Sequence, residues 1–74
     1  MEKVTLDTQG LLCPLPVLKA KKTLRSMTSG DLLEVITTDP GAVADFQCLC
    51  EEDALELLSQ EESAQFCIHL LKKV

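Results

Sequence analysis

The sequence predicts an α/β fold, a two-layer sandwich in which both helices cover one face of a four-stranded mixed sheet. Segments in which apolar and polar residues alternate are interspersed with two segments whose apolar residues recur every three or four positions, giving the order β-α-β-α-β-β. Right-handed crossovers place the helices of such a chain on the same face of the sheet. A chain of 74 residues has room for one domain, which is expected to span residues 1–74.

The first strand is predicted over residues 3–7, where Val4 and Leu6 face one side and polar residues face the other. A turn follows, and its Gly10 can adopt backbone angles that other residues resist. The chain therefore reverses direction just before Cys13.

The first helix is predicted from Pro14 to about Met27. Proline is well tolerated in the first helical turn, and the residue before a proline is pushed out of the helical conformation. Cys13 is therefore expected to be the N-cap. The apolar stripe of this helix consists of Val17, Ala20, Leu24 and Met27, and its basic outer face of Lys19, Lys22 and Arg25.

The second strand is predicted over residues 32–38, and its dense apolar character favours an interior position in the sheet. Asp39 and Pro40 then repeat the signal for a helix start, an acidic N-cap followed by a proline at the first helical position. Asp39 is expected to act only as this cap. The second helix should run to about residue 51 on an apolar stripe of Val43, Phe46 and Cys50.

Two further strands are predicted over residues 54–59 and 64–71, joined across residues 60–63. In the last strand Cys67 and His69 share one side, which is expected to be the open face of the sheet. Two side chains fall short of the three or four protein ligands of a usual zinc site, so no metal is expected.

The distribution of charge is uneven. The net charge is −5; residues 1–30 hold five basic and two acidic side chains, and residues 31–74 hold two basic and ten acidic ones. A phosphate backbone repels an acidic domain, so direct binding of nucleic acid is not expected. Phe46 and Phe66 are the only aromatic residues, which leaves no platform for stacking bases. The basic residues of the first helix are better suited to an acidic protein partner.

Hydropathy along the chain and its cysteine content indicate a cellular compartment. No stretch has the features of a secretory signal, and no apolar run approaches the roughly 18 residues of a membrane span, so a cytoplasmic protein without membrane contact is expected. In that compartment the four cysteines should be thiols. Cys48 and Cys50 would point about 200° apart on a helix, so they cannot bind one metal ion together or form a disulfide with each other. Packing roles are therefore expected for both, with a resolving or second carrier thiol as the alternative.

Cys13 has the setting of a nucleophile. The positive end of a helix dipole favours a thiolate over a thiol, and such a position can lower the pKa of a cysteine well below about 8.5. Pro14 and Pro16 lack N–H groups and stiffen the chain around the sulfur. The thiol is therefore expected to be exposed and held forward toward another protein.

Several short motifs together resemble the TusA/SirA family of small sulfur-carrier proteins. The motif with Cys13 is the most specific of them. The residues that carry the resemblance are Leu6-Asp7, Gly10-Leu11, Cys13-Pro14-Leu15-Pro16, Lys19-Ala20-Lys21-Lys22, Gly30-Asp31 and Asp39-Pro40. The resemblance implies the two-layer fold that this family shares with the C-terminal domain of translation initiation factor 3.

The resemblance also implies a function. Cys13 would accept sulfane sulfur as a transient persulfide from a cysteine desulfurase or a rhodanese-like donor and pass it to a thiol acceptor protein, with no bound cofactor. Gly10, Pro14 and Pro16 would present the thiol. Destinations in the family include tRNA thiolation, molybdenum-cofactor maturation and sulfur oxidation. The basic face of Lys19, Lys22 and Arg25 would dock an acidic donor.

Two alternatives belong to other functional classes. A non-catalytic interaction or regulatory module could use the open face of the sheet for binding or for dimerisation, although a monomer is expected. A thiol redox sensor could pair Cys13 with Cys48 or Cys50.

Overall fold

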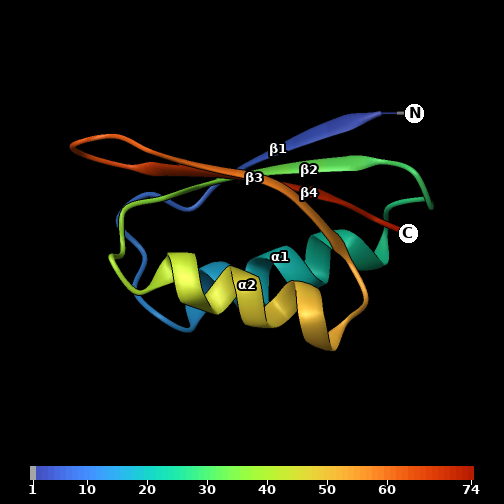
Figure 1. Ribbon diagram of the computed structural model, residues 1–74, viewed down its shortest axis with the longest axis horizontal. Helices are drawn as coiled ribbons and strands as arrows, with labels where there is room; N and C mark the ends of the chain where they lie inside the picture. The colour runs from blue at the N-terminus through green and yellow to red at the C-terminus, as the bar shows by residue number, and fades with distance from the viewer. Residues whose placement is uncertain (1) are drawn as a thin grey trace.

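The computed structural model describes residues 2–74 and has the predicted element order. Four strands form one sheet in the order β1-β2-β4-β3, and both helices lie on the same side of it (Figure 1). The two-layer α/β sandwich is therefore confirmed. The elements are β1 Lys3–Asp7, α1 Leu15–Arg25, β2 Leu32–Thr37, α2 Ala42–Glu52, β3 Glu56–Glu62 and β4 Cys67–Lys72.

The sheet is mixed because its connections differ in length. β1 pairs in parallel with β2 after the α1 crossover, whereas β2 and β3 both pair antiparallel with β4. β2 lies between two other strands, as its apolar sequence predicted. Leu33 and Val35 on its helix-facing side are fully buried, so β2 supplies the centre of the core.

The core fills the space between the sheet and the two helices. Phe46 of α2 is its largest fully buried side chain, and the apolar stripes of both helices pack around it as predicted. Its buried members are Ala20, Leu24, Met27, Leu33, Val35, Ala42, Phe46, Leu49, Cys50 and Leu71.

The last hairpin differs from the prediction in its boundaries. β3 begins at Glu56 because α2 continues to Glu52 and Ala54 then adopts a left-handed conformation with φ of 54°. The amide of Leu55 donates to the carbonyl of Cys50 at 2.9 Å, a bond typical of a helix C-terminus. The turn between β3 and β4 consequently falls at residues 63–66 rather than 60–63.

The predicted placement of Cys67 and His69 on the open face of the sheet is wrong. Both side chains are buried and face the helices, on the same side of β4 as the fully buried Leu71. The ring of His69 stacks on Phe46 with centroids 4.6 Å apart. Its Nε2 lies 2.8 Å from Thr37 Oγ1, and its Nδ1 lies 3.0 Å from the side-chain nitrogen of Gln60. These partners satisfy the ring, so a histidine can occupy the core.

Neither helix in residues 2–74 has the length and apolar character needed to cross a membrane.

Candidate functional site

Cys13 lies in the connection from β1 to α1, and its side chain is exposed. Figure 1 shows this connection at the same end of the molecule as the β2–α2 connection and the β3–β4 hairpin. Three segments that are distant in sequence therefore lie at the end of the molecule that carries Cys13 (Figure 1).

The helix start is displaced by one residue from the prediction. Pro14, not Cys13, is the N-cap of α1, because its carbonyl accepts the first helical hydrogen bond, from the amide of Leu18 at 3.1 Å. The Cys13–Pro14 peptide bond is cis. Pro14 is exposed, whereas Pro16 is buried in the first turn of the helix. Cys13 thus precedes the helix rather than capping it.

The end of β2 and the β2–α2 connection hold the segment that leads to Cys13. Both the amide and the hydroxyl of Thr8 donate to the carbonyl of Ile36, at 2.9 and 2.6 Å. The amide of Gly10 donates to Thr38 Oγ1 at 2.9 Å. Gly10 has a φ of +82°, which confirms that this turn uses the conformational freedom of glycine. The loop is therefore fastened on both sides of its turn.

The prediction that Asp39 acts only as the cap of α2 is wrong. Its Oδ2 accepts a hydrogen bond from the amide of Cys13 at 2.7 Å, while its Oδ1 accepts one from the amide of Gly41 at 3.1 Å. Gly41, rather than Asp39, is the N-cap of α2. One carboxylate thus joins the backbone of Cys13 to the beginning of the second helix.

The electrostatic setting of Cys13 is the reverse of the predicted one. The pKa of Cys13 is raised, chiefly because its thiol donates a hydrogen bond to the carboxylate of Asp45, and further by partial desolvation and by the negative charges of Asp45 and Asp39. A helix N-terminus carries only about half a positive charge. Two carboxylates outweigh it, and Cys13 stands outside the helix. The two carboxylates therefore favour the protonated form of the thiol.

The other cysteines differ from Cys13 in exposure. Cys48 is exposed, whereas Cys50 and Cys67 are buried and have raised pKa values, mainly because of that burial. All four thiols are free. Within residues 2–74, no group of three or more histidine, cysteine or acidic side chains is arranged to hold a metal ion.

The surface of α1 beside Cys13 combines charge with apolar area. Lys19, Lys22 and Arg25 are exposed, as the helical pattern predicted. Three leucines near the thiol are also exposed, by 69%, 45% and 52%: Leu12, Leu15 and Leu18. These leucines were not predicted as site residues, although Leu15 and Leu18 lie outside the apolar stripe of the helix, which is a signal of exposure in the sequence itself.

Comparison with known proteins adds independent information. A family model described as sulfurtransferase TusA matches residues 4–73. The sulfur carrier protein TusA of Allochromatium vinosum is 52% identical over 92% of this chain and 88% of its own length. A candidate sulfur carrier protein of Neisseria meningitidis is 48% identical over 84% of each chain. A candidate sulfur carrier of Bacillus subtilis is 34% identical over 95% of this chain but only 38% of its own length.

Proposed function

Because the chain belongs to the TusA family of sulfurtransferases, we propose that it is a sulfur carrier that holds sulfane sulfur as a persulfide on Cys13. The observation that carries this proposal is the exposed thiol of Cys13, on a loop whose backbone is fixed by Asp39. An exposed thiol on a fixed loop can meet a sulfur atom on another protein. The transient persulfide is the only cofactor-like group that the function requires.

The proposed reaction is two successive exchanges at sulfur. The thiolate of Cys13 attacks the outer sulfur of a donor persulfide, a new S–S bond forms, and the donor leaves as a thiolate. An acceptor thiolate then attacks the outer sulfur on Cys13, which returns as the thiolate. The sulfane sulfur changes hands without net oxidation or reduction. Gly10, Pro14 and Pro16 shape the loop that presents the atom under attack.

The partners we propose are proteins. The donor is a cysteine desulfurase or a rhodanese-like protein, and the acceptor is a thiol protein, all in the cytoplasm. Lys19, Lys22 and Arg25 would attract an acidic donor surface, and this attraction would raise the rate of encounter. The exposed leucines beside Cys13 would then supply the apolar contact at the centre of the interface.

Persulfide loading tests this function. Wild-type protein incubated with a persulfide donor should gain about 32 Da, the mass of one sulfur atom, and should lose it again to an excess of a thiol acceptor. Cys13→Ala should show no such adduct. Cys48→Ala, which removes the other exposed thiol, is the matched control and should load like the wild type. An adduct that persists in Cys13→Ala would disprove the proposal.

A further inference from the structure

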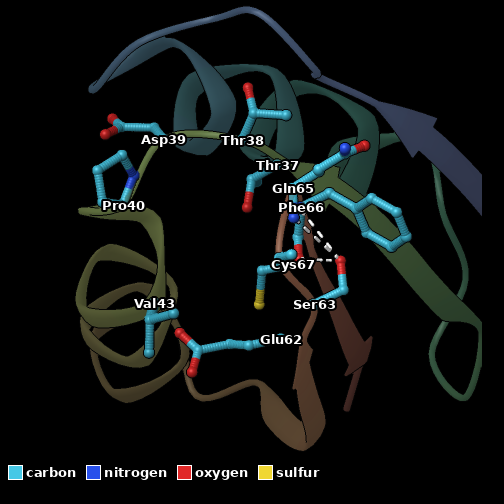
Figure 2. A pocket seen from close by; sticks show the side chains of 11 residues that line it. Thr37, Thr38, Asp39, Pro40, Val43, Glu62, Ser63, Gln65, Phe66 and Cys67 are labelled. Atoms are coloured by element: carbon cyan, nitrogen blue, oxygen red, sulfur yellow. Dashed lines mark hydrogen bonds between the residues drawn. The ribbon is translucent and has the colours of Figure 1, made fainter.

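A cleft opens beside the Cys13 loop, between the β2–α2 connection and the β3–β4 hairpin (Figure 2). Its volume is about 330 Å³. One wall is formed by residues 37–40 and Val43 at the start of α2, and the other by residues 62–67 of the hairpin. This volume is at the lower end of the range for ligand pockets, about 300–1,000 Å³. The cleft can therefore take a few side chains but not a folded surface.

The lining of the cleft combines apolar, neutral polar and acidic side chains. Pro40, Val43 and Phe66 contribute apolar surface, and the carboxylates of Asp39 and Glu62 belong to opposite walls. In Figure 2 the sulfur of Cys67 points into the space between Val43 and Glu62. The lining residues, all in the described part of the chain, include no lysine or arginine. The cleft thus offers a negative potential next to apolar contacts.

The cleft is continuous with the proposed sulfur site through one side chain. Asp39 lines the cleft, and its Oδ2 accepts the hydrogen bond from the amide of Cys13 at 2.7 Å. Asp39 alone would therefore separate a group bound in the cleft from the loop that presents the thiol.

We propose that this cleft docks an extended segment of a partner protein in which a lysine or arginine stands beside an aliphatic side chain. The aliphatic group would pack against Pro40 and Val43, and the cation would lie near Glu62, in a negative potential to which Asp39 adds (Figure 2). Charge complementarity identifies this occupant, because an acidic segment would be repelled by both walls. The proposal rests on the proposed function, since it concerns how a partner is held while sulfur moves to or from Cys13.

Docking of a cation at this place would also act on the thiol. The carboxylates of Asp45 and Asp39 raise the pKa of Cys13, and a positive charge in the cleft offsets part of that negative field. A larger fraction of Cys13 would then be thiolate when a partner is bound than when the carrier is alone. Docking and activation of the nucleophile would thus be coupled.

The test uses the whole protein and two synthetic peptides. The basic probe is acetyl-Leu-Arg-Val-Lys-Leu-amide, and the acidic control is acetyl-Leu-Glu-Val-Glu-Leu-amide. In an amide NMR titration, the basic peptide should shift the signals of Val43, residues 63–67 and Cys13, and the acidic peptide should not. Equal shifts with the two peptides, or shifts confined to α1 or to the open face of the sheet, would overturn the proposal.

Two variants make the test specific. Glu62→Lys reverses the charge of one wall and should weaken binding of the basic peptide by about tenfold. Glu61→Lys makes the same change on the neighbouring residue, which pairs with Ile68 and does not line the cleft. The affinity of this variant for the basic peptide should stay within about twofold of the wild-type affinity. An equal loss of affinity in both variants would contradict the proposal.

A loading control separates this inference from the proposed function. A small-molecule persulfide does not need the cleft, so the wild type should load Cys13 from it in the absence of any peptide. Failure of the wild type to load would disprove the proposed function. Normal loading with no preference for the basic peptide would disprove the docking cleft alone.

Discussion

The loop around Cys13 and the buried face of β4 around Cys67 each hold a thiol with a raised pKa, but the physical causes differ. For Cys13, which is exposed, the main cause is the hydrogen bond to the carboxylate of Asp45, supported by the charge of Asp39. For Cys67, the main cause is burial. A partner can neutralise carboxylates at a surface, whereas only opening of the fold exposes a core thiol. A partner can therefore restore the reactivity of Cys13. The reactivity of Cys67 stays low for as long as the protein is folded.

The hydrogen bonds of the two regions serve correspondingly different ends. Near Cys13, the side chains of Thr8, Thr38 and Asp39 fasten a surface loop to the end of β2 and to the β2–α2 connection. In the core, Thr37 and Gln60 hold the ring of His69. The first set fixes the position of a reactive group. The second set satisfies the ring nitrogens of His69, so this polar ring can fill space in the core.

The largest effect should follow from breaking the core region. Phe46→Ala removes the largest fully buried side chain and the stacking partner of His69, so the free energy of unfolding should fall by about 3–5 kcal/mol. Urea denaturation followed by circular dichroism measures it. Leu12→Ala, an exposed position in the Cys13 region, should change stability by less than about 0.5 kcal/mol. Comparable losses in the two variants would remove the contrast between the regions.

A smaller loss of stability should follow from cutting the bonds of Asp39. Asp39→Ala deletes the acceptors for the amides of Cys13 and Gly41, which should lower the free energy of unfolding by about 1–2 kcal/mol. Amide hydrogen exchange at Cys13 should become faster, while exchange in β2 at Val35 changes only with global stability. Asp39→Asn keeps one acceptor oxygen and should be intermediate. Unchanged exchange at Cys13 would show that Asp39 does not fix the loop.

The pH dependence of stability should report on the core histidine. Burial lowers the pKa of His69 in the folded protein, so the unfolded chain binds this proton more tightly. The corresponding stability is fully present above the unfolded pKa of about 6.5 and is lost as pH falls below it toward the lower folded pKa. The urea midpoint should therefore decrease below pH 6.5. His69 is the single histidine, so an NMR titration of its ring measures the folded pKa directly, and a value above 6.5 would contradict this reasoning.

The smallest change should leave the fold intact and alter only the reactivity of the thiol. Asp45→Asn replaces the carboxylate that raises the pKa of Cys13, first as a hydrogen-bond acceptor and further by its charge, with a neutral and weaker acceptor, so Cys13 should react faster with iodoacetamide at neutral pH. The urea midpoint should stay close to that of the wild type, because Asp45 lies in the first turn of α2 and outside the buried core. Asp53→Asn, at the other end of α2, is the control and should not change the rate. A slower reaction in Asp45→Asn would disprove the inhibitory role of this carboxylate.

Periodicity and turn residues were sufficient to predict the element order, the interior position of β2 and the packing stripes of both helices. They were sufficient because each of these features depends on residues that are close in sequence. Periodicity also showed that Cys67 and His69 share one side of β4. It could not show which side, because both sides of that strand carry apolar residues. The hydrogen-bond partners of His69 come from other strands, at Thr37 and Gln60.

The candidate site was predicted less completely, for a similar reason. Cys13 and the bend at Gly10 follow from the local sequence. The bond from Cys13 to Asp39 spans 26 residues, and Asp45 reaches the thiol from the second helix, so neither contact has a local signal. Reasoning from the helix start alone therefore gave the wrong direction for the pKa of Cys13. The direction of the shift in the pKa of Cys13 depends on how acidic side chains from other parts of the chain are arranged around it.

The most direct measurement locates the added sulfur among the four thiols. Trypsin should release residues 4–19, which contain only Cys13, and residues 26–72, which contain Cys48, Cys50 and Cys67. After persulfide loading and alkylation, mass spectrometry should find the added sulfur, about 32 Da, on the fragment 4–19. Sulfur found on the fragment 26–72 instead would contradict the assignment of Cys13 as the carrier residue.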